Sequence, residues 1–127
     1  MIEVKAYTKA TGAEPIGEWL KSIKDTKTKS IIMKSLTKLQ TGLIGNTAPV
    51  GEGVMEIKIH YSEGYRIYYA YHNNELIILL CGGSKSSQKR DIARAKEYWK
   101  EHMSRYAERE IKDEKHKRNS SRRTQKK

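Results

Sequence analysis

The hydrophobic positions along the chain change their period, and each change predicts a different kind of secondary structure. Residues 2–5 alternate between apolar and charged side chains, which predicts a short half-buried strand. From Pro15 the apolar residues recur at helical spacing, and a second stretch with the same period runs from about residue 26 to the glycines Gly42 and Gly45. The two stretches predict a helical hairpin after the first strand.

A segment rich in glycine, residues 44–54, is expected to form a surface loop, and after it the period becomes two. Residues 55–61 and 65–72 both alternate and are separated by a short turn, so they predict an antiparallel hairpin. A second tight turn leads into residues 76–80, which are all apolar. This run predicts a strand that is covered on both faces.

The last periodic segment predicts a long helix that begins near Ser86 or Ser87, since either residue is a good N-cap. Its apolar stripe is formed by Ile92, Ala95, Trp99, Met103 and Tyr106. The resulting order is β-α-α-β-β-β-α. It predicts an α+β domain with a mostly antiparallel four-stranded sheet, an N-terminal helical hairpin and a long C-terminal helix.

Basic residues outnumber acidic ones and gather at the C-terminal end. The 127 residues include 26 Lys and Arg against 15 Asp and Glu, a formal net charge of +11. This charge favours RNA, DNA or an acidic protein surface as the partner. Residues 119–127 contain no apolar side chain. We therefore expect one domain over residues 1–108 and a disordered basic tail over residues 109–127, acting either as a solvated end or as an RNA-binding arm.

Several classes of protein are disfavoured by what the chain lacks. A single cysteine, Cys81, rules out an internal disulfide framework and is best explained as a small buried filler in a reducing, cytoplasmic protein. The longest apolar run is far shorter than the roughly 20 residues that cross a bilayer, so we expect no membrane association. The four histidines show no metal-binding spacing, and we expect neither a metal nor another cofactor.

Four polar residues share one face of the predicted hairpin: Lys58, His60, Arg66 and Tyr68. The planar guanidinium of Arg66 can bind a phosphate, and Lys58 and His60 can exchange protons. The Tyr68 ring can stack on a base or orient its hydroxyl. The alternative is a solvated sheet face that carries charges for solubility.

A glycine-rich turn, Gly82-Gly83-Ser84-Lys85-Ser86, connects the apolar strand to the last helix. It lacks the glycine spacing of a Walker motif, so a nucleotide hydrolase is rejected. The free N–H groups at a helix start, with Lys85 beside them, favour an anion. An ordinary strand-to-helix connection is the alternative.

Three segments of the sequence resemble a known family. VGEGVMEIKIHY at residues 50–61, GYRIYY at residues 64–69 and LLCGGSKSSQ at residues 79–88 are similar to the addiction-module killer proteins of the RelE/ParE toxin superfamily, in its HigB-like branch. The resemblance spans residues 1–105. It implies the RelE/ParE-like fold, which has the element order predicted above.

The resemblance also implies an activity: a toxin that is held inactive by a cognate antitoxin, expected to be a helix-turn-helix protein, and that cuts mRNA on the ribosome. Its catalytic residues carry over to Arg66, Lys58 and Lys85, and His60 stands where another basic residue is common. The general base stays open, because a tyrosine used by some relatives has no match near Ile92.

The remaining expectations concern RNA contacts and the alternatives to cleavage. Tyr68, Lys89 and Arg90 are expected to bind the RNA. Two other functions remain open from the sequence: a ParE-like inhibitor of DNA gyrase, and an RNA- or ribosome-binding module without catalysis.

Overall fold

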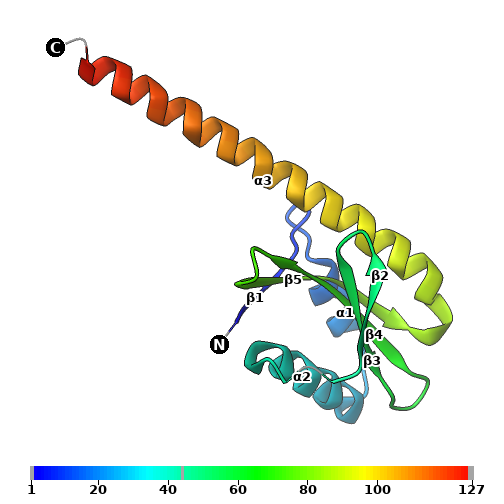
Figure 1. The fold of residues 1–127 in the computed structure, drawn as a ribbon. Helices are drawn as coiled ribbons and strands as arrows, with labels where there is room; N and C mark the ends of the chain where they lie inside the picture. Colours follow the sequence, from blue (N-terminus) through cyan, green and yellow to red (C-terminus); the bar gives the residue numbers. More distant parts are fainter. Residues whose placement is uncertain (1, 44, 126–127) are drawn as a thin grey trace.

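The computed structural model describes residues 2–43 and 45–125, and the side chains of residues 2–43 and 45–111. Its centre is a five-stranded sheet with the order β1-β5-β4-β3-β2 (Figure 1). The strands are β1 (Glu3–Ala6), β2 (Thr47–Gly51), β3 (Val54–Ile59), β4 (Tyr65–His72) and β5 (Leu76–Ser84). β1 pairs with β5 in parallel, and the other neighbours are antiparallel, so the sheet is mixed.

The sequence predicts four strands, and the structure has a fifth, β2. This strand lies within residues 44–54, where the sequence predicts a loop. It pairs with β3 at the edge of the sheet, and the register shifts between Pro49 and Gly51. Proline and glycine are tolerated there because an edge strand leaves one side of its backbone unpaired and a bulge absorbs the extra residue. The residues that indicated a loop are therefore those of a blunted edge strand.

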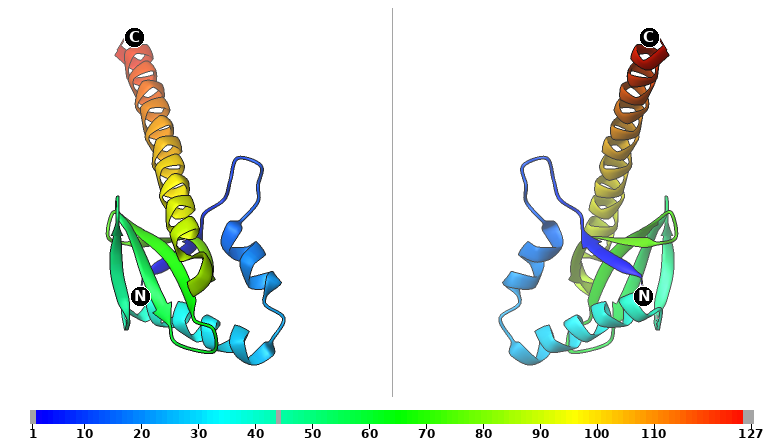
Figure 2. Two further views of the ribbon diagram at one scale, coloured as in Figure 1. Left: turned by 90° about the vertical axis from the view of Figure 1, so that its right-hand side faces the viewer. Right: turned by 90° about the vertical axis from the view of Figure 1, so that its left-hand side faces the viewer.

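Helices cover both faces of the sheet (Figure 2). α1 (Pro15–Ser22) and α2 (Thr26–Thr41) form the predicted helical hairpin, and their buried residues join Ile67 and Tyr69 of β4 in one core. α3 (Gln88–Gln125) follows a short 3-10 turn, Lys85–Ser87, and packs with Tyr68 and Ala70 in a second core. The alternation along β4 thus divides its side chains between two hydrophobic cores.

The strand β5 is an interior strand with helices on both sides, as its apolar sequence predicts. Ile77 and Leu80 are fully buried, in different cores. At its C-terminal end the glycines admit bulky neighbours. A Cβ on Gly82 would lie 2.2 Å from the Trp19 ring, and one on Gly83 would lie 1.9 Å from the Asp91 carboxylate. The pair of glycines is therefore required by close packing on both faces.

α3 is longer than the sequence predicts. It continues through residues 109–125, where we expected a disordered tail, and Figure 1 shows this half extending away from the sheet. The backbone of that segment is helical in the structure, whereas the division of the chain at residue 108 stays a prediction. No helix within the described ranges has the length and apolar character needed to cross a membrane.

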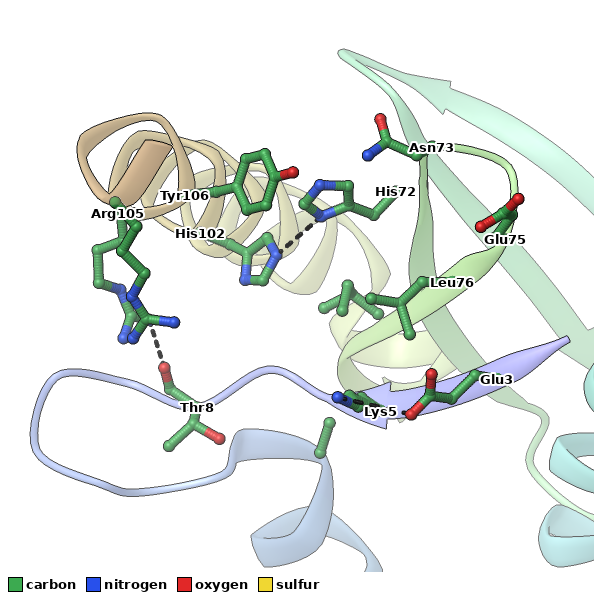
Figure 3. A pocket seen from close by; sticks show the side chains of 13 residues that line it. Glu3, Lys5, Thr8, His72, Asn73, Glu75, Leu76, His102, Arg105 and Tyr106 are labelled. Atoms are coloured by element: carbon green, nitrogen blue, oxygen red, sulfur yellow. Dashed lines mark hydrogen bonds and ion pairs between the residues drawn. The ribbon is translucent and has the colours of Figure 1, made fainter. Parts of the chain in front are cut away.

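Polar and aromatic contacts fix α3 where it leaves the domain. The Tyr7 hydroxyl donates to Glu101 at 2.6 Å, and Arg105 binds both Glu101 and the Thr8 carbonyl. Beside them, a ring nitrogen of His72 at the end of β4 lies 3.4 Å from a ring nitrogen of His102 on α3 (Figure 3).

The two histidines lie within an aromatic cluster and beside a cavity. The ring of Tyr106 lies edge-on to His72 with centroids 4.2 Å apart, and Trp99 stacks on His102 at 5.4 Å. His72 and His102 line a cavity of about 640 Å³ between α3 and β1, which we call the distal cavity (Figure 3). The histidine pair thus joins the helix to the sheet at the point where the core ends.

We expect Gly82→Ala to lower the free energy of unfolding by about 1–3 kcal/mol, because the new methyl group must displace the Trp19 ring from a packed core. Gly45→Ala is the matched control, since a Cβ there meets nothing within 4 Å. Urea denaturation of both variants measures the difference. Equal stability of the two variants would show that the packing at Gly82 is loose.

The histidine pair predicts a pH dependence of stability. The pKa of His102 is held below its ordinary value, first by burial and then by the charges of His72, Arg105 and Arg109. The folded protein then binds fewer protons than the unfolded chain, so the stability is complete above about pH 6.5 and falls as the pH drops below that value.

We expect His102→Gln to reduce the loss of stability that occurs as the pH falls. Free energies of unfolding at about pH 7.5 and about pH 5.5, on either side of the ordinary histidine pKa, measure it. The difference between wild type and variant should grow smaller as the pH falls. Parallel pH profiles for the two proteins would show that His102 does not couple its protonation to folding.

Candidate nucleic-acid site

The turn between β3 and β4 and the start of the last helical segment enclose a hollow of about 390 Å³, which we call the turn hollow. Its lining residues are His60, Tyr61, Ser62, Glu63, Gly64, Arg66 and Lys85. Three of the four residues predicted to be catalytic therefore come together, although they lie on three different segments. The fourth, Lys58, does not line the hollow.

Arg66 is buried rather than exposed on a solvated face. The residue is 7% exposed, and its Nε lies 3.8 Å from Oε2 of Glu56, which is itself 2% exposed. The same Glu56 oxygen accepts a hydrogen bond from Nε2 of Gln88 at 2.8 Å, in the first turn of α3. Nε of Arg66 has no hydrogen-bond partner among the described residues. The guanidinium is thus held by an ion pair, and its buried Nε lies against Glu56 rather than in the hollow.

The approach of the turn to Arg66 depends on Gly64. This residue has a φ of 84°, and a Cβ there would lie 3.8 Å from Nη1 of Arg66 and 3.6 Å from Cβ of Lys85. The Lys85 N–H also donates to the Gly64 carbonyl at 3.1 Å. A glycine adopts this left-handed conformation without strain, so the turn can bring the two cationic residues to one hollow.

Lys58 and His60 lie in different positions relative to the turn hollow. Lys58 pairs with Arg66 in the β3–β4 register, which puts two positive charges side by side on neighbouring strands. His60 follows the end of β3, is exposed, and has its Nε2 2.5 Å from Nδ2 of Asn46. His60 is therefore the accessible imidazole at the hollow, and Lys58 adds charge from outside its lining.

The expectation that Tyr68 stacks on RNA does not fit the structure, because its side chain is buried. Its ring is fully buried under α3, and no described residue is hydrogen-bonded to its hydroxyl. Burial and the neighbouring Glu56 raise the pKa of this hydroxyl well above its ordinary value. The alternating pattern correctly placed Tyr68 on the face of Arg66, but α3 covers that face. A base has no accessible Tyr68 surface in this structure.

The other sequence-predicted residues near the site differ in exposure. Lys89 and Arg90 are exposed on the first turn of α3, where a polyanion can reach both of them. Cys81 is buried, and burial raises the pKa of its thiol to about 12. The prediction that Cys81 is a small buried filler is thus confirmed.

Two residues that support the site were missed by reasoning from sequence. They are Glu56 on β3 and Gln88 in the first turn of α3, and the sequence analysis assigned a role to neither. The available signal was the position of Glu56 two residues before Lys58 on the same face of the strand, within reach of Arg66 on the neighbouring strand. No group of three or more His, Cys, Asp or Glu within the described part of the chain could hold a metal ion.

Comparisons with known proteins support the resemblance at the level of the family. The family of phage-derived Gp49-like proteins (DUF891) matches residues 18–100, a range that contains the whole turn hollow. A protein of Haemophilus influenzae, described as uncharacterized, is 41% identical over 78 residues, which are 61% of this chain and 79% of that protein. The Gp49-like family is part of the RelE/HigB-like group of toxins from toxin–antitoxin systems. The chain therefore belongs to the Gp49-like phage-derived family, within this toxin group.

Proposed function

We propose that this toxin inhibits translation by cutting mRNA on the ribosome, as a metal-independent endoribonuclease. The observation that carries the proposal is the meeting of Arg66, Lys85 and His60 at one hollow. RNA cleavage without a metal requires charge stabilisation at the phosphate and proton transfer; a guanidinium and an ammonium can supply the first, and an imidazole can supply the second. The proposed place of action is the cytoplasm, and the proposed partners are the ribosome, its mRNA and a helix-turn-helix antitoxin.

The chemistry uses the RNA's own 2′-OH as the nucleophile. Its oxygen attacks the adjacent phosphorus, the bond from phosphorus to the 5′-oxygen breaks, and the products carry a 2′,3′-cyclic phosphate and a 5′-OH. One proton leaves the 2′-OH and one must reach the departing 5′-oxygen. The protein therefore needs donors for the phosphoryl oxygens and a group that moves protons.

The residues of the turn hollow divide these roles. Arg66 binds the phosphoryl oxygens through the terminal nitrogens of its planar fork as charge builds on them, because Nη1 lies beside Gly64 of the hollow whereas Nε is buried against Glu56. Lys85 supplies a second positive charge. Because a guanidinium stays protonated in proteins, the base is sought elsewhere than at Arg66. His60 is the proposed proton-transfer group because it is accessible at the hollow, and Lys58 is the alternative from the neighbouring strand position.

A test of Arg66 must respect its burial. Removing the guanidinium would leave Glu56 buried without its partner, a change that costs about 3–5 kcal/mol of stability in comparable pairs. Arg66→Lys keeps the positive charge and loses the fork. We expect this variant to remain folded and to cut about 10²–10³ times more slowly, the usual cost of one lost transition-state donor.

The measurement is primer extension on an mRNA translated in a purified system, under single-turnover conditions. Arg109→Lys, at the distal cavity, is the matched control and should cut at the wild-type rate. Unchanged cutting by Arg66→Lys would remove Arg66 from the mechanism. Inhibition without any cut in the wild-type reaction would favour non-catalytic binding to the ribosome or mRNA, and a reaction with neither inhibition nor a cut would favour gyrase inhibition.

The basic C-terminal segment predicts a salt dependence. Residues 115–127 contain seven Lys and Arg, and their side chains lie outside the described residues. Each phosphate that such a side chain neutralises on a single strand steepens the dependence of log K on log salt by about 0.7. We expect deletion of residues 115–127 to weaken ribosome binding and flatten this slope, while cutting at saturating ribosomes persists.

Binding of full-length and truncated protein to ribosomes across a salt series measures this effect. Equal slopes would show that the segment does not contact RNA. Loss of cutting at saturation would mean that the segment contributes to the active site itself.

A further inference from the structure

One flank of α3 carries lysines that are spaced by whole helical turns. Lys96 follows Lys89 by two turns and Lys100 follows Lys96 by one, so their side chains leave the same side of the helix. Lys89 and Lys100 are exposed, and Lys96 is partly buried. With a rise of about 1.5 Å per residue, this row of positive charges is about 16 Å long.

The lysine row faces the outer strands of the sheet, β2 and β3. A Cβ on Gly51, at the end of β2, would lie 3.3 Å from Nζ of Lys96. A Cβ on Gly53, in the β2–β3 turn, would lie 3.0 Å from Nε1 of Trp99. The bare backbone of this turn therefore lies directly beside the flank of α3 that carries the lysines.

The sheet surface next to the row is partly exposed. Gln88, the residue before Lys89, donates to Glu56 in the middle of β3, so the row follows this strand. α3 packs mainly over β4 and β5. Ala48 of β2 pairs with Glu56, and Lys58 lies two residues after it, so all three side chains share one face of the sheet. Ala48 and Lys58 are only half-buried there, and a ligand can reach them beside the helix.

The positive charges along this surface are not neutralised by the protein. We call the four lysines the basic strip: Lys58, Lys89, Lys96 and Lys100. Within the part of the chain that the structure describes, none of them forms an ion pair. Two acidic residues lie on the same stretch of α3, but Asp91 is buried and only Glu97 is exposed. Positive charge therefore exceeds negative charge along the strip.

The position of Lys58 is unfavourable in the protein alone. It lies directly opposite Arg66 on the neighbouring strand, and like charges in that arrangement destabilise a sheet. The nearby carboxylate of Glu56 is already paired with Arg66 and bonded to Gln88. Lys58 thus gains a counter-charge when an anion binds beside it.

The basic strip begins where the turn hollow ends. Lys85 of the hollow precedes Lys89 by about one turn, and Lys58 is the strand partner of Arg66. A polyanion held at the hollow therefore meets the strip as it continues along α3. A single row of cations matches the backbone of one strand, whereas a duplex presents two rows of phosphates.

From this arrangement we propose that the basic strip binds the phosphate backbone of single-stranded RNA that leaves the turn hollow, and leads it along α3 towards the β2–β3 turn. The inference rests on the proposed function, because the turn hollow is its starting point. It gives Lys96 and Lys100 a role in binding, and in this arrangement Lys58 contacts a phosphate.

The test uses the full chain and 2′-O-methyl RNA, which cannot be cut because the nucleophile is blocked. Fluorescence anisotropy measures the affinity for a trinucleotide and a nonamer across a salt series. The variant is Lys89→Gln with Lys96→Gln. Its matched control is Lys34→Gln with Lys38→Gln, which removes the same charge from exposed positions of α2 on the opposite face of the sheet.

Two lost phosphate contacts should reduce the slope of log K against log salt by about 1.4 for the nonamer. If the affinities converge at about 1 M salt, this change corresponds to about 25-fold weaker binding at about 0.1 M salt. We expect the trinucleotide, which the turn hollow accommodates, to lose much less. The control variant should bind the nonamer with nearly the wild-type slope.

Equal slopes for the wild type and the strip variant, or equal losses in both variants, would overturn the inference. An equal loss for an RNA duplex would assign the strip to double-stranded RNA, and competition by a hexaglutamate peptide that depends on Lys96 would assign it to an acidic protein. Either result would reject single-stranded RNA as the occupant. Strip-dependent binding in a protein that cuts no mRNA would leave the strip standing and reject the nuclease.

Discussion

The Arg66 guanidinium lies between the sheet and the first turn of α3, and a charge in that place requires a partner. An unpaired buried charge costs several kcal/mol, and here Glu56 offsets the cost from the neighbouring strand. Gln88 then ties Glu56 to α3. The start of the helix is therefore positioned by a polar network as well as by apolar packing, and Lys85, just before that start, lies at the turn hollow.

Glycines bring side chains and backbone close together at this end of the sheet. Gly64 brings the β3–β4 turn close to Arg66 and Lys85, and the glycines of β5 let Trp19 and Asp91 approach the sheet from opposite sides. One end of the sheet thus combines the cationic turn hollow with the closely packed side chains of Trp19 and Asp91. The distal cavity, at the other end of β4, is lined by the histidine pair that fixes α3 as it leaves the domain.

Much of the fold follows from the periodicity of the sequence. The helical hairpin, the β3–β4 hairpin, the apolar strand β5 and the start of α3 were all predicted, because each buries a face with a regular repeat. The strand β2 was missed because Pro49 and the glycines indicate a turn, and only its position at an edge makes them compatible with pairing. The helical continuation of α3 beyond residue 108 was missed because a segment whose one large apolar residue is Ile111 carries no periodic signal.

The sequence predicted which residues form the site, but it did not predict that Arg66 and Tyr68 are buried. A period of two assigned Arg66 and Tyr68 to one face, but it does not state what covers that face. The helix that buries both is far away in the sequence. The support of Arg66 by Glu56 and Gln88 is likewise a tertiary contact that local patterns do not encode.

The most direct measurement of the central claim is the chemical identity of the RNA ends. Mass spectrometry of mRNA fragments from a purified translation reaction distinguishes attack by the 2′-OH from attack by water. With Arg66, Lys85 and His60 acting on the RNA's own nucleophile, the fragments must carry a 2′,3′-cyclic phosphate or its hydrolysed 3′-phosphate, together with a 5′-OH. Fragments ending in a 3′-OH and a 5′-phosphate would contradict this mechanism.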